Sequence, residues 1–244
     1  MRRAFSLVEI LVTIGIIAVL IAILIPALAG TKESASELKS LANLRSIGQL
    51  LANHAAENNG AYPFYEPGSE LRWGPDGEQG PTINDLPWEA RERWAALDSV
   101  RAVAPWREHY ESWLSPGIEP HPNGAWVQED SRGRFTRWPS YQYSNSFIGK
   151  PAVWSENRPD FLDSAQKHAL ADVRFPSQKV VLWDEDRAYL LPEPHADDPR
   201  PVLFADSSAS LRQDSDATPP VRNPFSYPMR VYNDTPNGIH GRDF

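Results

Sequence analysis

The sequence has no cysteine among its 244 residues. It therefore offers neither a disulfide framework nor a thiolate metal site. Its six histidines form no H-x-H or H-E-x-x-H pair, so the zinc-enzyme signature is absent. A G-x-S-x-G nucleophile elbow and a glycine-rich phosphate loop are absent as well. With no catalytic motif to support an enzyme, we predict a non-enzymatic protein that needs no cofactor.

Positive charge is also scarce: the sequence has 24 Lys and Arg against 32 Asp and Glu, which gives a formal net charge of -8. Nucleic-acid binding needs a basic face, so we predict no nucleic-acid partner. Two residue types are unusually frequent, since the sequence contains 23 Pro and nine Trp. They predict a loop-rich domain with aromatic packing, and the length suffices for a helix plus one such domain.

One long apolar run is present, from Ile10 to Ala29. Twenty helical residues span roughly 30 Å, the thickness of the hydrocarbon core of a bilayer. Arg2 and Arg3 precede the run and would keep the N-terminus in the cytoplasm, with the remainder on the far side of the membrane. Glu9 stands at the start of the run, where an ionisable group is costly and tends to mark function.

The residues Ala4-Phe5-Ser6-Leu7-Val8-Glu9 resemble the prepilin N-terminus of type IV pilins and type II secretion pseudopilins. The resemblance implies that a prepilin peptidase cuts between Ala4 and Phe5 and that Phe5 is then N-methylated. Ala4 stands where the family usually has Gly. The implied partners are other pilin or pseudopilin subunits, in the inner membrane and then in a pilus or pseudopilus, with the globular domain on the periplasmic side. Glu9 would neutralise the freed α-amino group of a neighbouring subunit.

Pro26 falls where many members of this family also carry a proline. It removes one helical hydrogen bond and crowds the preceding turn, which predicts a kink or local melting of the helix. A rival reading starts from the A-x-A at 27–29 before Gly30, which looks like a signal-peptide cleavage site. An uncut anchor is the third reading. On either of these, the chain is a secreted or membrane-anchored binding or hydrolase domain, but the apolar run exceeds the about 7–15 residues usual for the apolar region of a signal peptide.

Beyond Gly30 the apolar residues recur every three or four positions, which predicts an amphipathic continuation of the same helix. Gly60 follows two asparagines, and Gly is the usual residue just past a helix C-terminus, so we expect the helix to end there. A helix from Phe5 to Asn58 would be roughly 80 Å long. The predicted apolar stripe consists of Leu38, Leu41, Leu44, Ile47 and Leu51.

For the remainder we predict an antiparallel meander that covers the apolar stripe, hence an α+β fold with a long helix on a small sheet. The predicted segments are a leader at 1–4, a transmembrane and assembly helix at 5–29, its amphipathic continuation at 30–60, a Trp- and Pro-rich insertion at 61–175, and C-terminal strands with a tail at 176–244. The predicted strands are 141–144, 179–184, 188–191, 202–205 and 209–212; the predicted helices of the insertion are 87–103, 105–114 and 160–173; the predicted loops are 61–85 and 116–134.

The C-terminal third carries a second, weaker resemblance. The phrase at 201–207, PVLFADS, resembles the end of the H-x9-DG group of prepilin-type proteins, with His195 and Asp206 as the matching His and Asp. Ten residues separate these two instead of nine, and Ser207 replaces the Gly. Asp184, Asp186 and Asp206 are weak calcium candidates, because Ca²⁺ prefers several carboxylate oxygens from loops, although no EF-hand spacing is present.

Overall fold

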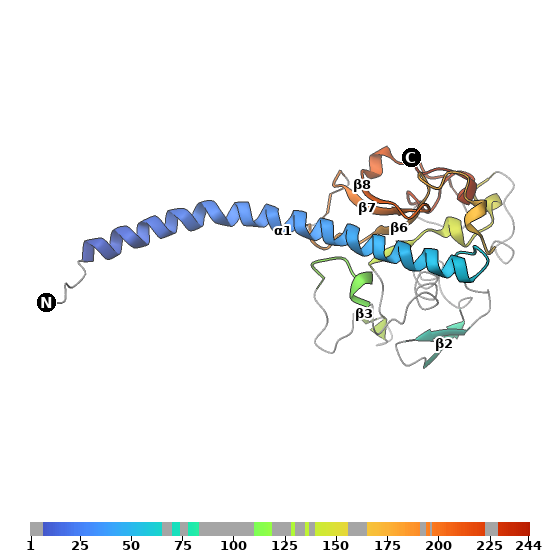
Figure 1. Ribbon diagram of the computed structural model, residues 1–244, viewed down its shortest axis with the longest axis horizontal. Coiled ribbons are helices and arrows are strands. Elements are labelled where there is room, and N and C mark those ends of the chain that lie inside the picture. Colours follow the sequence, from blue (N-terminus) through green and yellow to red (C-terminus); the bar gives the residue numbers. More distant parts are fainter. Residues whose placement is uncertain are drawn as a thin grey trace.

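The computed structural model shows a long helix that projects from a small α+β domain (Figure 1). The N-terminus lies at the far tip of the helix, and the C-terminus lies on the domain. The residues that the structure describes are 7–64, 70–73, 78–82, 110–118, 128–129, 135–136, 140–155, 165–190, 194–195, 197–222 and 229–244.

Helix α1 runs from Leu7 to Glu57, 51 residues or about 77 Å. It passes through Pro26 without interruption, so of the two effects predicted for Pro26, a kink or local melting, the melting does not occur; Figure 1 shows a gentle bend along the helix. A proline removes a single N–H from the ladder, and the bonds of the neighbouring turns keep the helix continuous. The predicted end is confirmed, because Asn59 and Gly60 both have positive φ and the Gly60 N–H bonds to the carbonyl of Ala55.

Four antiparallel strands form the main sheet, in the order β5-β6-β7-β8. They match four of the five predicted strands. The fifth, at 188–191, is wrong: its described residues, 188–190, form a turn. The chain turns there because the backbone N–H of Arg187 bonds to the Asp184 side chain and Arg187 has a positive φ of 43°. The strands are β5 (Tyr141–Tyr143), β6 (Val180–Asp184), β7 (Arg200–Phe204) and β8 (Ala209–Arg212).

The insertion differs from its prediction in three places. Where a helix was expected at 160–173, the described part has one 3-10 turn, η6 (Leu170–Asp172), because Ala165 and Ala169 form isolated antiparallel bridges with Gly149 and Ala61. The predicted loop at 61–85 contains one short hairpin, and a second hairpin begins in the predicted loop at 116–134 and ends just beyond it. These are β1 (Glu70–Trp73) with β2 (Glu78–Thr82), and β3 (Gln128–Glu129) with β4 (Phe135–Thr136).

The remaining short elements are 3-10 turns. The helix predicted at 87–103 lies outside the described residues. Of the helix predicted at 105–114, only residues 110–114 are described, and they begin with a 3-10 turn. The turns are η2 (Tyr110–Trp113), η3 (Asn145–Phe147), η4 (Pro151–Trp154), η7 (Asp214–Asp216) and η8 (Gly238–His240).

The core forms where the second half of α1 packs on the sheet. Leu44 and Ile47 are fully buried, and Leu41 and Leu51 nearly so. Gly48 lets the helix approach closely, since a Cβ there would lie 2.9 Å from Cδ1 of Leu203. The prediction that Leu38 belongs to the buried stripe is wrong, because its side chain is 65% exposed. It precedes Ser40, the first buried residue of the helix.

Candidate functional site

The first half of α1 leaves its apolar side chains uncovered. Every large apolar side chain described between Leu7 and Leu28 is between 49% and 79% exposed. Mean hydropathy reaches 3.0 over an 18-residue window of which nothing is buried, and this is the one helix of the described residues that is long and apolar enough to cross a membrane. The apolar residues surround the helix on all sides, which is typical of a segment in lipid or in a helix bundle.

Glu9 is the acidic residue of the first turn of this helix. One turn later, the hydroxyl of Thr13 donates a hydrogen bond to the Glu9 carbonyl oxygen at 2.7 Å. Glu9, Ile10, Thr13 and Ile14 together line a shallow, mostly apolar groove on one face of the helix. The structure therefore places a carboxylate on an exposed, mostly apolar face of the helix.

The two predicted processing residues, Ala4 and Phe5, lie outside the described residues. Pro26 lies within α1, on the exposed half of the helix. Cleavage, methylation and the assembly roles of Glu9 and Pro26 thus remain predictions from the sequence.

A buried polar cluster attaches the other half of α1 to the domain. Its centre is Asp184, at the end of β6, whose side chain is fully buried. The Oδ2 atom accepts hydrogen bonds from the hydroxyls of Ser40 on α1 at 2.7 Å and of Ser115 at 2.9 Å. Tyr141 extends the cluster, with its hydroxyl 3.1 Å from Ser40 Oγ. The cluster links the helix, the sheet and the segment after η2.

Burial raises the pKa of Asp184 to about 6, because a carboxylate without water is costly. The hydrogen bonds from Ser40, from the Arg187 backbone and from Ser115 act in the opposite direction, since they stabilise the charged form. Three donors of the protein thus stabilise the charged carboxylate. The raised pKa of Asp184 indicates that these hydrogen bonds offset only part of the cost of burying the charge.

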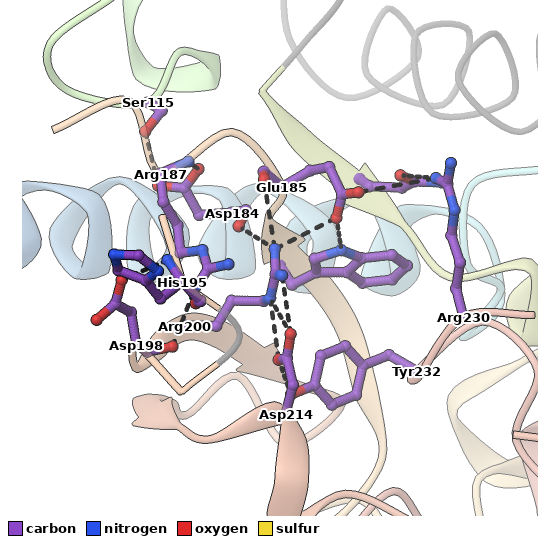
Figure 2. Close-up of polar contacts among 12 residues, drawn as sticks. Ser115, Asp184, Glu185, Arg187, His195, Asp198, Arg200, Asp214, Arg230 and Tyr232 are labelled. Atoms are coloured by element: carbon purple, nitrogen blue, oxygen red, sulfur yellow. Dashed lines mark hydrogen bonds and ion pairs between the residues drawn. The ribbon is translucent and has the colours of Figure 1, made fainter. Parts of the chain in front are cut away.

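A second polar network, shown in Figure 2, lies at the same end of the sheet. Arg200 donates to both carboxylate oxygens of Asp214, with distances of 2.8 to 3.0 Å, and to the backbone carbonyl of Asp184 at 2.8 Å. Tyr232 donates its hydroxyl to Asp214 at 2.8 Å. Glu185 accepts from the indole of Trp183 at 2.6 Å and from Arg200 at 3.3 Å.

These contacts join β6, β7, η7 and the segment that carries Tyr232. A bidentate Arg–carboxylate pair fixes orientation as well as distance, so the network is well suited to hold segments in register. The sequence reasoning missed it, because the partners of Arg200 and Tyr232 in this network are 14 or more residues away along the chain and no local motif marks them.

The two residues of the weaker resemblance lie at opposite ends of β7. His195 precedes the strand and is exposed; its backbone N–H bonds to the Asp198 carboxylate at 2.6 Å. Asp206 lies in the tight turn between β7 and β8, where its Oδ1 atom accepts bonds from the N–H and hydroxyl of Ser208. Ser207 has a φ of 67°, the left-handed conformation that favours glycine. This turn explains why a Gly would suit position 207.

The calcium candidates do not converge. The Asp184 side chain is buried and accepts hydrogen bonds from protein donors. Asp186 is exposed two residues later, and Asp206 lies beyond the far end of β7. Among the described residues, no group of three or more His, Asp or Glu side chains gathers to hold a metal ion. That the protein needs no cofactor therefore stays a prediction from the sequence, with calcium at these residues as its weak alternative.

Comparison with known proteins gives one partial match. The type II secretion system core protein G of Pectobacterium carotovorum subsp. carotovorum is 37% identical to this chain over 67 residues. The match covers 28% of this chain and 42% of the relative, so the chain spans less than half the length of the relative it matches. No family model matches the chain. No solved structure matches it either.

Proposed function

We propose that this chain is a pseudopilin-like or minor-pilin-like subunit of a secretion or pilus machine. Prepilin peptidase removes residues 1–4, the first half of α1 anchors the chain in the inner membrane, and that same half then packs against neighbouring subunits in a pilus or pseudopilus. The observation that carries the proposal is the exposed apolar half of α1. The partial relationship to a type II secretion system core protein supports it.

The physical argument begins with the cost of exposed apolar surface. Covering one large apolar side chain is worth about 1.5–3 kcal/mol, so a helix that exposes many of them must be covered by lipid or by other helices. The domain begins to cover the helix at Ser36 and Glu37, which are half-buried, and the first fully covered residue is Ser40. The uncovered half is therefore free to insert first into a membrane and later into a bundle of identical or similar helices.

Glu9 makes assembly a better explanation than plain anchoring. An anchor gains nothing from a carboxylate in its apolar part, whereas a bundle can pair it with a cation from another chain. The cation that we propose is the α-amino group of Phe5 on a neighbouring subunit, which the cleavage after Ala4 creates.

The test is site-specific photo-crosslinking in membranes of cells that carry a prepilin peptidase and the other components of the machine. A benzophenone amino acid replaces Ile16, which is 57% exposed on the apolar half. Assembly predicts a ladder of covalent multimers that contain this chain. The same amino acid at Met229, which is 44% exposed on the domain, is the comparison site and should give far fewer multimers.

The role of the charge is tested with Glu9→Gln, which keeps the size and shape of the side chain. It should abolish the ladder at Ile16 while the chain stays in the membrane. Thr13→Val is the matched control, since Thr13 lines the same groove and should tolerate the change. Monomers alone from the unmodified chain, or an intact ladder in Glu9→Gln, would show that the helix is only an anchor.

A further inference from the structure

Lys179, directly before β6, has a fully buried ammonium group, and its exposed fraction is 0%. Its Nζ atom donates to the Thr235 hydroxyl at 2.8 Å and lies 3.4 Å from each carboxylate oxygen of Asp243. Thr235 and Asp243 are themselves only 1% exposed. A lysine and a carboxylate thus face each other in a site that is closed to bulk solvent.

The backbone holds Asp243 firmly in this position. Its N–H bonds to the carbonyl of Gln178 at 2.8 Å, and its own carbonyl accepts from the N–H of Thr218 at 2.6 Å. Its Oδ2 atom accepts from the backbone N–H of Val180 at 2.7 Å. Such fixed positioning converts a reaction between two groups into an effectively unimolecular one.

The Thr235 hydroxyl connects the two reacting groups. It accepts a hydrogen bond from Lys179 Nζ and donates one to Oδ1 of Asp243. A proton can therefore pass from the amine to one carboxylate oxygen, while the other oxygen faces the Val180 N–H, a donor suited to stabilise negative charge there. Nucleophile, proton relay and oxyanion donor are all present in one buried site.

We propose that Lys179 and Asp243 join in an intramolecular amide bond. A proton moves from the ammonium through the Thr235 hydroxyl to Oδ1 of Asp243, which leaves a neutral amine and a neutral acid. Nζ attacks Cγ, and the bond between them forms as negative charge collects on Oδ2. The bond from Cγ to Oδ1 then breaks, and Oδ1 with its proton takes a second proton from Nζ and departs as water. Nothing is oxidised or reduced.

The surroundings make the neutral amine that this reaction needs less costly to form than in an exposed lysine. Burial lowers the pKa of Lys179, while the nearby charges of Asp243 and Asp234 raise it and so oppose the burial. Both carboxylate oxygens of Asp234 are engaged by other donors, the indole of Trp154 and the backbone N–H of Arg230. Asp243 is therefore the carboxylate that faces the amine.

Mass spectrometry of the full chain tests the proposal. The purified protein is denatured and digested with trypsin, which cuts after unmodified lysine. The expected product is a branched peptide, in which residues 175–187 remain joined through Lys179 to the peptide that begins at Asp243. Its mass lies one water below the sum of the two separate peptides. A succinimide at Asp243 loses the same mass but leaves the peptides apart, so fragment spectra distinguish the two.

Two variants test which side chains take part in forming the amide bond. Lys179→Arg keeps the positive charge and should lose the branched peptide. Thr235→Val removes the relay while both reacting groups stay, and should reduce the branched fraction severalfold. Cleavage after Lys179 together with a free peptide from Asp243, obtained from a wild-type sample that unfolds cooperatively, would overturn the proposal and show a buried ion pair only.

Discussion

The replacement Asp184→Asn is the sharpest test of how the helix is held on the domain. The asparagine keeps the shape of the side chain, its oxygen can accept from the Arg187 N–H, and its amide can donate to the two serine hydroxyls. What it removes is the buried negative charge. The variant thus separates the cost of that charge from the hydrogen bonds that surround it.

The magnitude follows from the pKa of Asp184, which is about 6 in the folded chain against an ordinary value of 3.8. A difference of roughly two units corresponds to about 3 kcal/mol. Because the folded-state pKa is the higher one, the folded state binds the proton more tightly. Protonated Asp184 therefore contributes its full share to the stability of the fold below about pH 4. About 3 kcal/mol of this stability is lost as the pH rises from about 4 to about 6 and the side chain becomes charged.

Thermal unfolding of the full chain in detergent, from pH 4 to pH 8, measures the effect. The Tm of Asp184→Asn minus that of the wild type should rise with pH by roughly 5–10 °C and level off above about pH 7. Asp206→Asn, in the exposed β7–β8 turn, is the control, and its difference should stay small because water solvates that side chain. A difference for Asp184→Asn that does not change with pH would refute the reasoning.

Three further outcomes are expected from the structure. Ser207→Gly should stabilise the chain by up to about 1 kcal/mol in urea unfolding, because glycine adopts the left-handed turn without strain; a destabilised variant would contradict this. Leu44→Ala should cost about 2–5 kcal/mol since Leu44 is fully buried, whereas Leu38→Ala at a 65% exposed position should stay within about 0.5 kcal/mol; similar losses in both would be inconsistent with the packing. Adding Ca²⁺ to chelated protein should leave Tm unchanged, because Asp184 is engaged by protein donors, and a clear rise would place a cation site in the chain.

Local patterns predicted much of the fold. The three-to-four spacing from Leu41 to Leu51 marked the buried face of α1, and Gly60 marked its end, because both signals depend on neighbouring residues alone. Runs of β-prone residues between polar turns marked β6, β7 and β8 for the same reason. The α+β arrangement then followed, since one apolar stripe needs a sheet to cover it.

Contacts between distant residues were beyond such patterns. The sequence at 160–173 has helical composition, but in its described part bridges to Ala61 and Gly149 hold an extended path. Asp184 looked like a surface carboxylate in an acidic turn, and its burial arises from Ser40 and Ser115, which are 144 and 69 residues away. The apolar run could be recognised from sequence, but only the structure showed that the domain leaves it uncovered.

The mature N-terminus of the chain, determined by mass spectrometry from membranes of cells with a prepilin peptidase, tests the central claim most directly. The account predicts a start at Phe5 that carries an N-methyl group, lost in Ala4→Asp and retained in Ala29→Leu. A start at Gly30 that Ala29→Leu blocks would contradict it and indicate a secreted domain. An uncut chain beginning at Met1 would contradict it as well and leave the helix as an anchor alone.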